Sequence, residues 1–297
     1  MNALPALLLL AVAALLAGCQ GGGAGGLMIS LPGPAGQALR AAAGVAPAVP
    51  GAFSDIDEPE EIELGRAVAA NLGSRYPLLR DRALTRYVTM VGNVVAAESE
   101  RPDVRYRFAV LDTPEVNAFA APGGFIFVTR GALAAMRDEA TLAGVLAHEV
   151  AHVALRHGID DVKAEKRKHL AVVAVQQGLA QTRVRAFSNL IASAADVVAD
   201  QVVLKGFSRA DESAADRAGI AYAGRVGYDP AGLRDFLRTL GQRSAQDASM
   251  TRFFATHPPT GDRLSEVTPL VQAQAGGVRN PERFAAALRG GGQRPAR

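Results

Sequence analysis

Five residues in the middle of the chain, His148-Glu149-Val150-Ala151-His152, have the types and the spacing of a metal-binding helix. They lie in a mostly apolar run from Thr141 that contains no proline and ends at Gly158, which predicts an α-helix. Helix positions four apart differ by about 40° around the axis, so the two imidazoles project to one side. They can bind one zinc ion, and Glu149 can reach a water on that ion. The chemistry that this arrangement indicates is hydrolysis of a peptide bond by zinc-activated water.

A zinc ion held by two histidines needs a third protein ligand, which leaves one position for water. Glu212 is the leading candidate, because it lies near the start of a predicted helix that is otherwise small and apolar. Asp216 follows one turn later on the same side and can accept the second ring N–H of a zinc-bound histidine, which we expect to be His148. The alternative is that each pair only lies on the exposed face of an ordinary amphipathic helix, the two histidines on one helix and the two acids on the other.

The other three histidines are weaker candidates for zinc ligands. His157 lies five residues after His152, a rotation of about 140° on a straight helix, so we expect it to miss the zinc and to interact with the helix end. His169 lies in a basic, polar stretch and is expected to be solvated. His257 precedes Pro258, which favours extended backbone, and on the residues alone it is a surface loop histidine.

Helices and a small sheet are expected to position these residues, because the hydrophobic period changes along the chain. Helical spacing covers 60–71, 81–98, 208–226 and 230–240, and a further helix ends near Gln274. Strands are predicted over 105–111, 116–120 and 125–129, and we expect them to form a small antiparallel sheet before the zinc motif. A sheet edge beside a metal ion can bind an extended peptide by strand addition.

The stretch 160–204 is apolar in parts but is interrupted by Gln, Arg and Asp residues. No window reaches the ~18 uncharged apolar residues of a membrane helix. We expect two amphipathic helices that cover the core or the cleft, with an interfacial membrane helix as the alternative.

The composition is that of a globular protein, with 49% hydrophobic and 21% charged residues. The net charge is only +3, and no basic patch interleaved with aromatic residues supports nucleic-acid binding. Cys19 is the only cysteine, which excludes a disulfide framework and a thiolate zinc site.

The N-terminus predicts a lipoprotein signal peptide over residues 1–18 and a flexible Gly/Ala/Pro tether over 19–54. The apolar run ends Leu16-Ala17-Gly18-Cys19, which resembles the lipobox of bacterial lipoproteins and implies lipidation of Cys19. By resemblance to the sorting of known lipoproteins, Gln20 after the cysteine implies the outer membrane, facing the periplasm. The short n-region lacks Lys and Arg, and a plain secretory signal with an incidental cysteine is the alternative.

Four features in one order resemble the M48 family of zinc metallopeptidases, and most closely its soluble periplasmic or lipoprotein branch. They are the zinc motif with His157-Gly158 after it, Glu212-Ser-Ala-Ala-Asp216, Asn117-Ala118-Phe119 before Pro122-Gly123-Gly124, and His257-Pro258 followed by Arg263. The H-E-x-x-H motif is shared with many zinc peptidases, whereas the combination in this order is much more specific. The resemblance covers roughly residues 55–271.

The fold that these features predict is α+β. We expect a mostly helical, zincin-type metallopeptidase domain over residues 55–275, with the small antiparallel sheet beside the H-E-x-x-H helix. The tail over 276–297 is expected to be partly disordered.

The resemblance also implies the roles of individual residues. One Zn²⁺ is bound by His148, His152 and Glu212, with Glu149 as the general base. Further residues at the site are Asp216 and Arg263 beside the ligands, Asn117, Ala118 and Phe119 near the substrate cleft, and His257. The last is implied to contact either the zinc or the reaction intermediate, and it is our candidate for stabilising an oxyanion.

The function that the resemblance implies is endoproteolysis of misfolded or misassembled cell-envelope proteins. One alternative is a zinc-containing periplasmic chaperone or assembly factor for outer-membrane proteins that rarely cuts them. Another is a structural lipoprotein with a fortuitous motif, which predicts no stoichiometric zinc. In all three interpretations the N-terminal lipid attaches the protein to the membrane.

Overall fold

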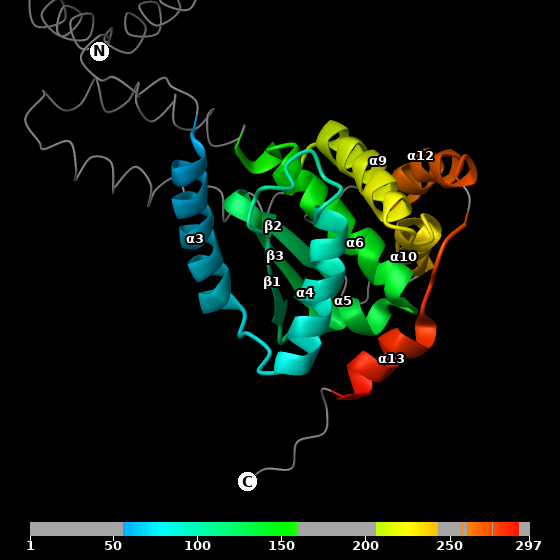
Figure 1. Ribbon diagram of the computed structural model, residues 1–297, viewed down its shortest axis with the longest axis horizontal. Helices are drawn as coiled ribbons and strands as arrows, with labels where there is room; N and C mark the ends of the chain where they lie inside the picture. The colour runs from blue at the N-terminus through cyan, green and yellow to red at the C-terminus, as the bar shows by residue number, and fades with distance from the viewer. Residues whose placement is uncertain (1–55, 160–205, 243–256, 258–259, 275, 291–297) are drawn as a thin grey trace, which may run out of the picture. The chain divides into compact units, whose positions relative to one another are not determined.

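The computed structural model describes residues 56–159, 206–242, 257, 260–274 and 276–290, and the account that follows concerns these residues (Figure 1). Cys19, the tether and the two helices expected within 160–204 lie outside them. Within the described ranges, no helix is long and apolar enough to cross a membrane.

Two helices precede the sheet, and an aspartate begins each of them. The side chain of Asp57 accepts a hydrogen bond from the Glu60 N–H at the start of α3 (Glu58–Arg75). Asp81 caps α4 (Arg82–Ala96) in the same way. Such side chains satisfy N–H groups that have no partner inside the helix, so both helices start where the sequence places a cap.

The sheet has three strands in the order β1-β3-β2, namely β1 (Arg107–Leu111), β2 (Ala118–Ala121) and β3 (Phe125–Thr129). β3 runs antiparallel to β2 but parallel to β1, so the sheet is mixed, and the expectation of an antiparallel sheet was wrong on this point. The reason is the order of the strands. The chain passes from β1 to the far edge for β2 and then returns between them, so β3 has a neighbour of each direction.

A tight turn over Pro122–Gly124 makes this return possible. Gly123 has φ 69° and Gly124 has φ 89°, backbone angles that residues other than glycine rarely adopt. A Cβ on Gly123 would also lie 2.8 Å from the Cα of Ile62 in α3. The buried carboxylate of Glu61 accepts a hydrogen bond from the Gly123 N–H at 3.1 Å, so α3 holds the turn in place.

The sheet lies between α3 on one face and α4 and α6 on the other (Figure 1). Alternate residues of each strand enter different cores, as the pleat requires. Ala118 and Ala120 of β2 pack with α6, whereas Phe119 and Ala121 pack with Leu64 and other residues of α3.

After β3 come the short helix α5 (Arg130–Ala135) and α6 (Glu139–Ala154), which carries the zinc motif. Asp138 caps α6, and the carbonyl of Arg279 accepts hydrogen bonds from the first two N–H groups. All sixteen residues of α6 are buried, because helices pack around it. These include α4, α9 (Arg209–Arg225), α10 (Ala231–Gln242) and α13 (Pro281–Gly290).

Three of these elements match or correct particular predictions. The capping box of Ser208 and Asp211 at the start of α9 is confirmed. α12 (Thr260–Gln272) lies against α9 and α10. The fold continues past the expected domain end at 275, because Phe284 of α13 is buried and its ring lies 6.5 Å from that of Tyr87.

Candidate metal centre

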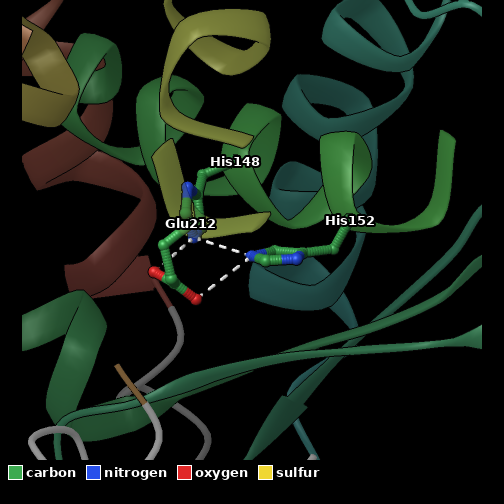
Figure 2. A group of neighbouring side chains, drawn as sticks. All are labelled: His148, His152 and Glu212. Carbon is green, nitrogen blue, oxygen red and sulfur yellow. Dashed lines mark hydrogen bonds and ion pairs between the residues drawn. The ribbon is translucent and has the colours of Figure 1, made fainter. Parts of the chain in front are cut away.

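Three side chains converge where α9 crosses α6: His148 and His152 from α6, and Glu212 from the first turn of α9 (Figure 2). The Nε2 atoms of the two histidines lie 3.1 Å apart. Glu212 places one carboxylate oxygen 3.6 Å from Nε2 of His148 and the other 3.4 Å from Nε2 of His152. All three side chains are at least 95% buried.

These distances fit a zinc ion. A tetrahedral ion with bonds of about 2.0–2.1 Å holds its ligand atoms about 3.4 Å apart. Two imidazole nitrogens and one carboxylate oxygen are also the donor set of a catalytic zinc site that keeps a fourth position for water. The structure therefore brings together the three residues that the sequence suggested, at distances that one zinc ion can bridge.

A close crossing of helices sets the distance between the two halves of the site. Gly219 of α9 lies directly against the backbone of α6, where a Cβ would be 2.8 Å from the nitrogen of His148. Glu212 lies almost two turns before Gly219 on the same helix, so this contact decides how far its carboxylate reaches.

Behind His148 lies a buried pair of opposite charges. Nδ1 of His148 is 2.9 Å from Oδ1 of Asp216, as the spacing of Glu212 and Asp216 suggested. Arg263 of α12 binds both oxygens of Asp216 at 2.8 and 2.5 Å and reaches Glu212 at 2.9 Å. Burial and Arg263 lower the pKa of His148, but the bond to Asp216 and the charge of Glu212 outweigh them and raise it.

The neighbours also decide which of the buried acids ionise. Burial raises the pKa of Glu212, but His257 and Arg263 outweigh it and hold that pKa well below its usual range. Burial likewise opposes ionisation of Asp216, and Arg263 more than compensates. Burial lowers the pKa of His152 to about 3, so this ring is neutral, as a zinc ligand must be.

His152 has partners that the sequence did not suggest. Its Nδ1 lies 2.9 Å from Nδ1 of His157, and the ring of Phe207 stacks on it at a centroid distance of 4.1 Å. His157 was expected to miss the zinc and to interact with the helix end, on the assumption of a straight helix, and the structure places its ring against the outer nitrogen of His152. α6 ends at Ala154, and Arg156 has φ 62°, so the chain turns back and brings His157 to the rim of the site.

Glu149 is buried beside the three ligands, with 2% of its surface exposed. Burial raises the pKa of its carboxyl above the usual value, and the negative charge of Glu212 adds to this effect. His148, His257 and Arg263 lower that pKa without reversing the shift. A carboxylate with a raised pKa is a stronger base, which suits a group that must take a proton from water.

His257 is buried rather than exposed in a surface loop, so the interpretation from the residues alone was wrong. Its Nδ1 lies 3.0 and 3.1 Å from the two oxygens of Glu212, and its ring centroid lies 5.8 Å from that of His148. It therefore faces the same cluster that the zinc ligands form.

Comparison with known proteins agrees with this geometry. The sequence profile of peptidase family M48 matches residues 82–271, which is more than half of the chain. The chain belongs to peptidase family M48. The family and the buried His-His-Glu cluster together identify zinc as the cofactor and the described residues as a zinc metalloendopeptidase domain.

Several named proteases are similar to this chain. The beta-barrel assembly-enhancing protease of Yersinia pestis is 28% identical over 73% of the chain and 44% of its own length. Metalloprotease YcaL of Escherichia coli is 30% identical over 70% of the chain and 74% of its own length. The mitochondrial metalloendopeptidase OMA1 of Schizosaccharomyces pombe is 30% identical over 62% of the chain and 52% of its own length. The chain thus spans less than half the length of the assembly-enhancing protease that it matches.

The segment Asn117-Ala118-Phe119 was expected near the substrate cleft, and that role stays a prediction. Phe119 points into the core against α3, where its ring lies 5.9 Å from that of Tyr76, so its side chain does not face α6. The side-chain oxygen of Asn117 accepts a hydrogen bond from the Ala118 N–H and is turned toward its own strand. What this segment presents beside α6 is Ala118, Ala120 and backbone.

Proposed function

We propose that this chain is a zinc-dependent endopeptidase that cleaves misfolded or misassembled proteins of the bacterial cell envelope. The observation that carries the proposal is the placement of Glu149, a buried carboxylate with a raised pKa, beside three ligands spaced for zinc. Family membership supports the reaction, and the names of the relatives support the class of substrate.

The zinc ligands would be His148, His152 and Glu212, and Glu149 would be the general base. A zinc ion held there would act as a Lewis acid that lowers the pKa of a water to about 7 and polarises the peptide carbonyl. Glu149 would accept a proton from the attacking water and give it to the nitrogen of the leaving amine. The raised pKa of Glu149 favours the first half of this transfer, in which the carboxylate takes the proton.

Asp216 and Arg263 would hold the site in place rather than react. Asp216 orients His148 through its Nδ1, and such partners of zinc-bound histidines affect metal affinity. Arg263 supplies the positive charge that makes two buried carboxylates tolerable so close together.

The backbone of β2 would hold an extended substrate. The N–H of Thr129 donates to the carbonyl of Asn117, so their pair is a hydrogen-bonded one. Such pairs alternate along antiparallel strands, so the N–H and C=O of Ala120 point away from β3. Asn117 already occupies the N–H of Ala118. A substrate strand would therefore pair with β2 around Ala120, on the strand that packs against α6.

His257 would stabilise the oxyanion that forms on the substrate. Support comes from its burial and from its contact with both oxygens of Glu212, which keeps the ring within the cluster. Donors already aimed at the position where charge develops cost no reorganisation during the reaction.

The site of action would be the periplasm, with the chain attached to the outer membrane by lipid on Cys19. The support is the sequence Leu16-Ala17-Gly18-Cys19 and the Gly/Ala/Pro-rich segment over 19–54. Replacing Cys19 with serine should release the protein from the membrane fraction and abolish incorporation of labelled fatty acid. Unchanged labelling would contradict this anchor.

The test of the reaction is a zinc assay paired with cleavage of an unfolded model protein, for the wild type and for Glu149→Gln. We expect about one zinc per chain in both proteins and cleavage only by the wild type. Turnover by the variant would exclude Glu149 as the general base. A wild type that binds no zinc would exclude the whole proposal and favour a fortuitous motif.

A zinc-containing assembly factor is the second candidate. The observation that favours it is the name beta-barrel assembly-enhancing protease, which relatives in Yersinia pestis and Escherichia coli carry and which combines assembly with proteolysis. Both functions use the same metal site but depend differently on Glu149. In a strain that lacks the protein, Glu149→Gln should fail to restore envelope integrity if cleavage is the main task. Full complementation by this variant would support assembly instead.

A further inference from the structure

The two histidines proposed as zinc ligands have different partners at their outer nitrogens. Nδ1 of His148 faces the carboxylate of Asp216 at 2.9 Å, whereas Nδ1 of His152 faces the imidazole of His157 at 2.9 Å. An ionised carboxylate accepts hydrogen bonds and cannot donate them, whereas an imidazole nitrogen either donates or accepts. The role of His157 therefore depends on where the protons lie.

The geometry of the cluster decides where the proton of His152 lies. Its Nε2 points at Nε2 of His148 and at Glu212, so this nitrogen must offer its lone pair to the ion. Because His152 is neutral as a ligand, its proton lies on Nδ1 and is donated to Nδ1 of His157. The proton of His157 must then lie on Nε2, on the side where Oδ1 of Asp211 lies 3.8 Å away.

The surrounding chain is built to keep His157 in this position. Arg156, the residue in the left-handed conformation, donates from Nη2 to the carbonyl of Ile56 at 2.6 Å and lies 3.3 Å from Glu61. The ring of Phe207 covers the face of His152, so the imidazole is held by a stack on its face and a hydrogen bond at its edge. Asp211 belongs to the capping box that begins α9, the helix of Glu212.

We propose that His157 is a positioning residue for the metal: it accepts the Nδ1–H of His152 and so directs Nε2 of that ring toward the zinc. The inference rests on the proposed zinc site, but it concerns binding of the ion and not cleavage. His157 adds no negative charge, in contrast to Asp216, so its contribution is orientation of the ring. Partners of this kind typically change metal affinity by 10–100-fold.

Two substitutions separate the hydrogen bond from the space that the ring fills. His157→Leu fills much of the space but accepts no hydrogen bond, whereas the side-chain oxygen of Asn in His157→Asn can take the place of Nδ1. Zinc affinity is measured by competition with a chromogenic chelator on the purified chain. We expect about 10–100-fold weaker binding for His157→Leu and binding within about threefold of the wild type for His157→Asn. Equal affinity of wild type and His157→Leu would overturn the proposal, as would equal loss in both variants.

Cobalt substitution gives a readout that a loss of general stability would not move. The visible spectrum of bound Co²⁺ reports the geometry of its ligands, so it should change in His157→Leu and return in His157→Asn. Thermal melting of both metal-free variants is the control for folding. An unchanged spectrum in His157→Leu would contradict a positioning role.

A measurement on the wild type keeps the proposal testable if His157→Leu fails to fold. Long-range ¹⁵N spectra of the histidine rings in the zinc-loaded protein should show the proton of His152 on Nδ1 and that of His157 on Nε2. A proton on Nδ1 of His157 would overturn the inference even if Glu149 were shown to be the general base. Conversely, inactivity toward unfolded protein would leave this result standing, so the two proposals can fail separately.

Discussion

Glu139 and Glu149 are two glutamates of one helix, ten residues apart, with exposed fractions of 0% and 2%. Ten residues correspond to about 15 Å along α6, so the two groups occupy separate ends of the same buried element. Their pKa values nevertheless move in opposite directions. That of Glu139 falls to about 2, whereas that of Glu149 rises.

The difference lies in the hydrogen-bond donors around each carboxylate. Burial opposes ionisation of Glu139, but four side chains compensate for it: the hydroxyls of Tyr87 and Tyr228 at 2.7 Å, the amide of Asn280 at 3.1 Å and the guanidinium of Arg283. None of the hydrogen bonds found in the described part of the chain involves the carboxylate of Glu149. A buried carboxylate that accepts hydrogen bonds from several donors stabilises the fold. A buried carboxylate that lacks such donors remains basic enough to react.

The largest expected effect tests this division in the reaction itself. Glu149→Gln should lower the rate of cleavage by about 10²–10⁴-fold, the usual contribution of a general base. Glu139→Gln should leave the rate per bound zinc within about twofold of the wild type, because it removes no group near the metal. Rates normalised to zinc content and to the folded fraction measure both. A large loss of the normalised rate in Glu139→Gln would contradict the division.

Stability should respond in the opposite way. Glu139→Gln removes the charge that Arg283 and the two tyrosines surround, so we expect a loss of about 3 kcal/mol in the free energy of unfolding. Glu149→Gln should cost nothing measurable, because it removes a buried charge to which no side chain among the described residues donates a hydrogen bond. Urea unfolding of the metal-free proteins gives both values. The control is Asp112→Asn, which breaks the exposed pair with Arg130 and should change stability by less than about 0.5 kcal/mol.

The pH dependence of stability tests whether the negative charge of Glu139 stabilises the fold. The pKa of Glu139 is about 2 in the folded chain and near its ordinary value of 4.5 in the unfolded chain. The unfolded state therefore binds more protons between these values, and the stability from Glu139 is complete above pH 4.5 and is lost as the pH falls toward 2. The gap between wild type and Glu139→Gln should shrink by about 2–3 kcal/mol from pH 6 to pH 2.5. A gap that stays constant would show that the charge of Glu139 does not stabilise the fold.

Local rules were sufficient for the elements that carry the metal ligands. Spacing along one helix places His148 and His152 together, and the capping box at Ser208 places Glu212 in the first turn of α9. These features depend only on residues within a few positions of each other. That is why the sequence alone could suggest them.

Features that depend on distant partners could not be predicted in this way. The strand order follows from how α3 holds the turn at Gly123, and the position of His157 follows from the left-handed residue Arg156. The chain after Gly276 has few apolar residues except at 284–288, so α13 was assigned to the tail. Its place in the fold is secured by Phe284 and by the pairing of Arg283 with Glu139, which lies 144 positions earlier.

The smallest expected effect compares two glycines that pack against opposite ends of α6, Gly219 of α9 and Gly232 of α10. A Cβ on Gly219 would lie 2.8 Å from the nitrogen of His148, and one on Gly232 would lie 2.0 Å from the carbonyl oxygen of Ala140, next to Glu139. Gly219→Ala and Gly232→Ala should each cost about 1–2 kcal/mol of stability, because the crossing helices must move apart. Only Gly219→Ala should also weaken zinc binding, by about tenfold, since it alone moves Glu212 away from the two histidines. Chelator competition on both variants decides the matter, and equal zinc affinity in the two would mean that the ends of α6 are not independent.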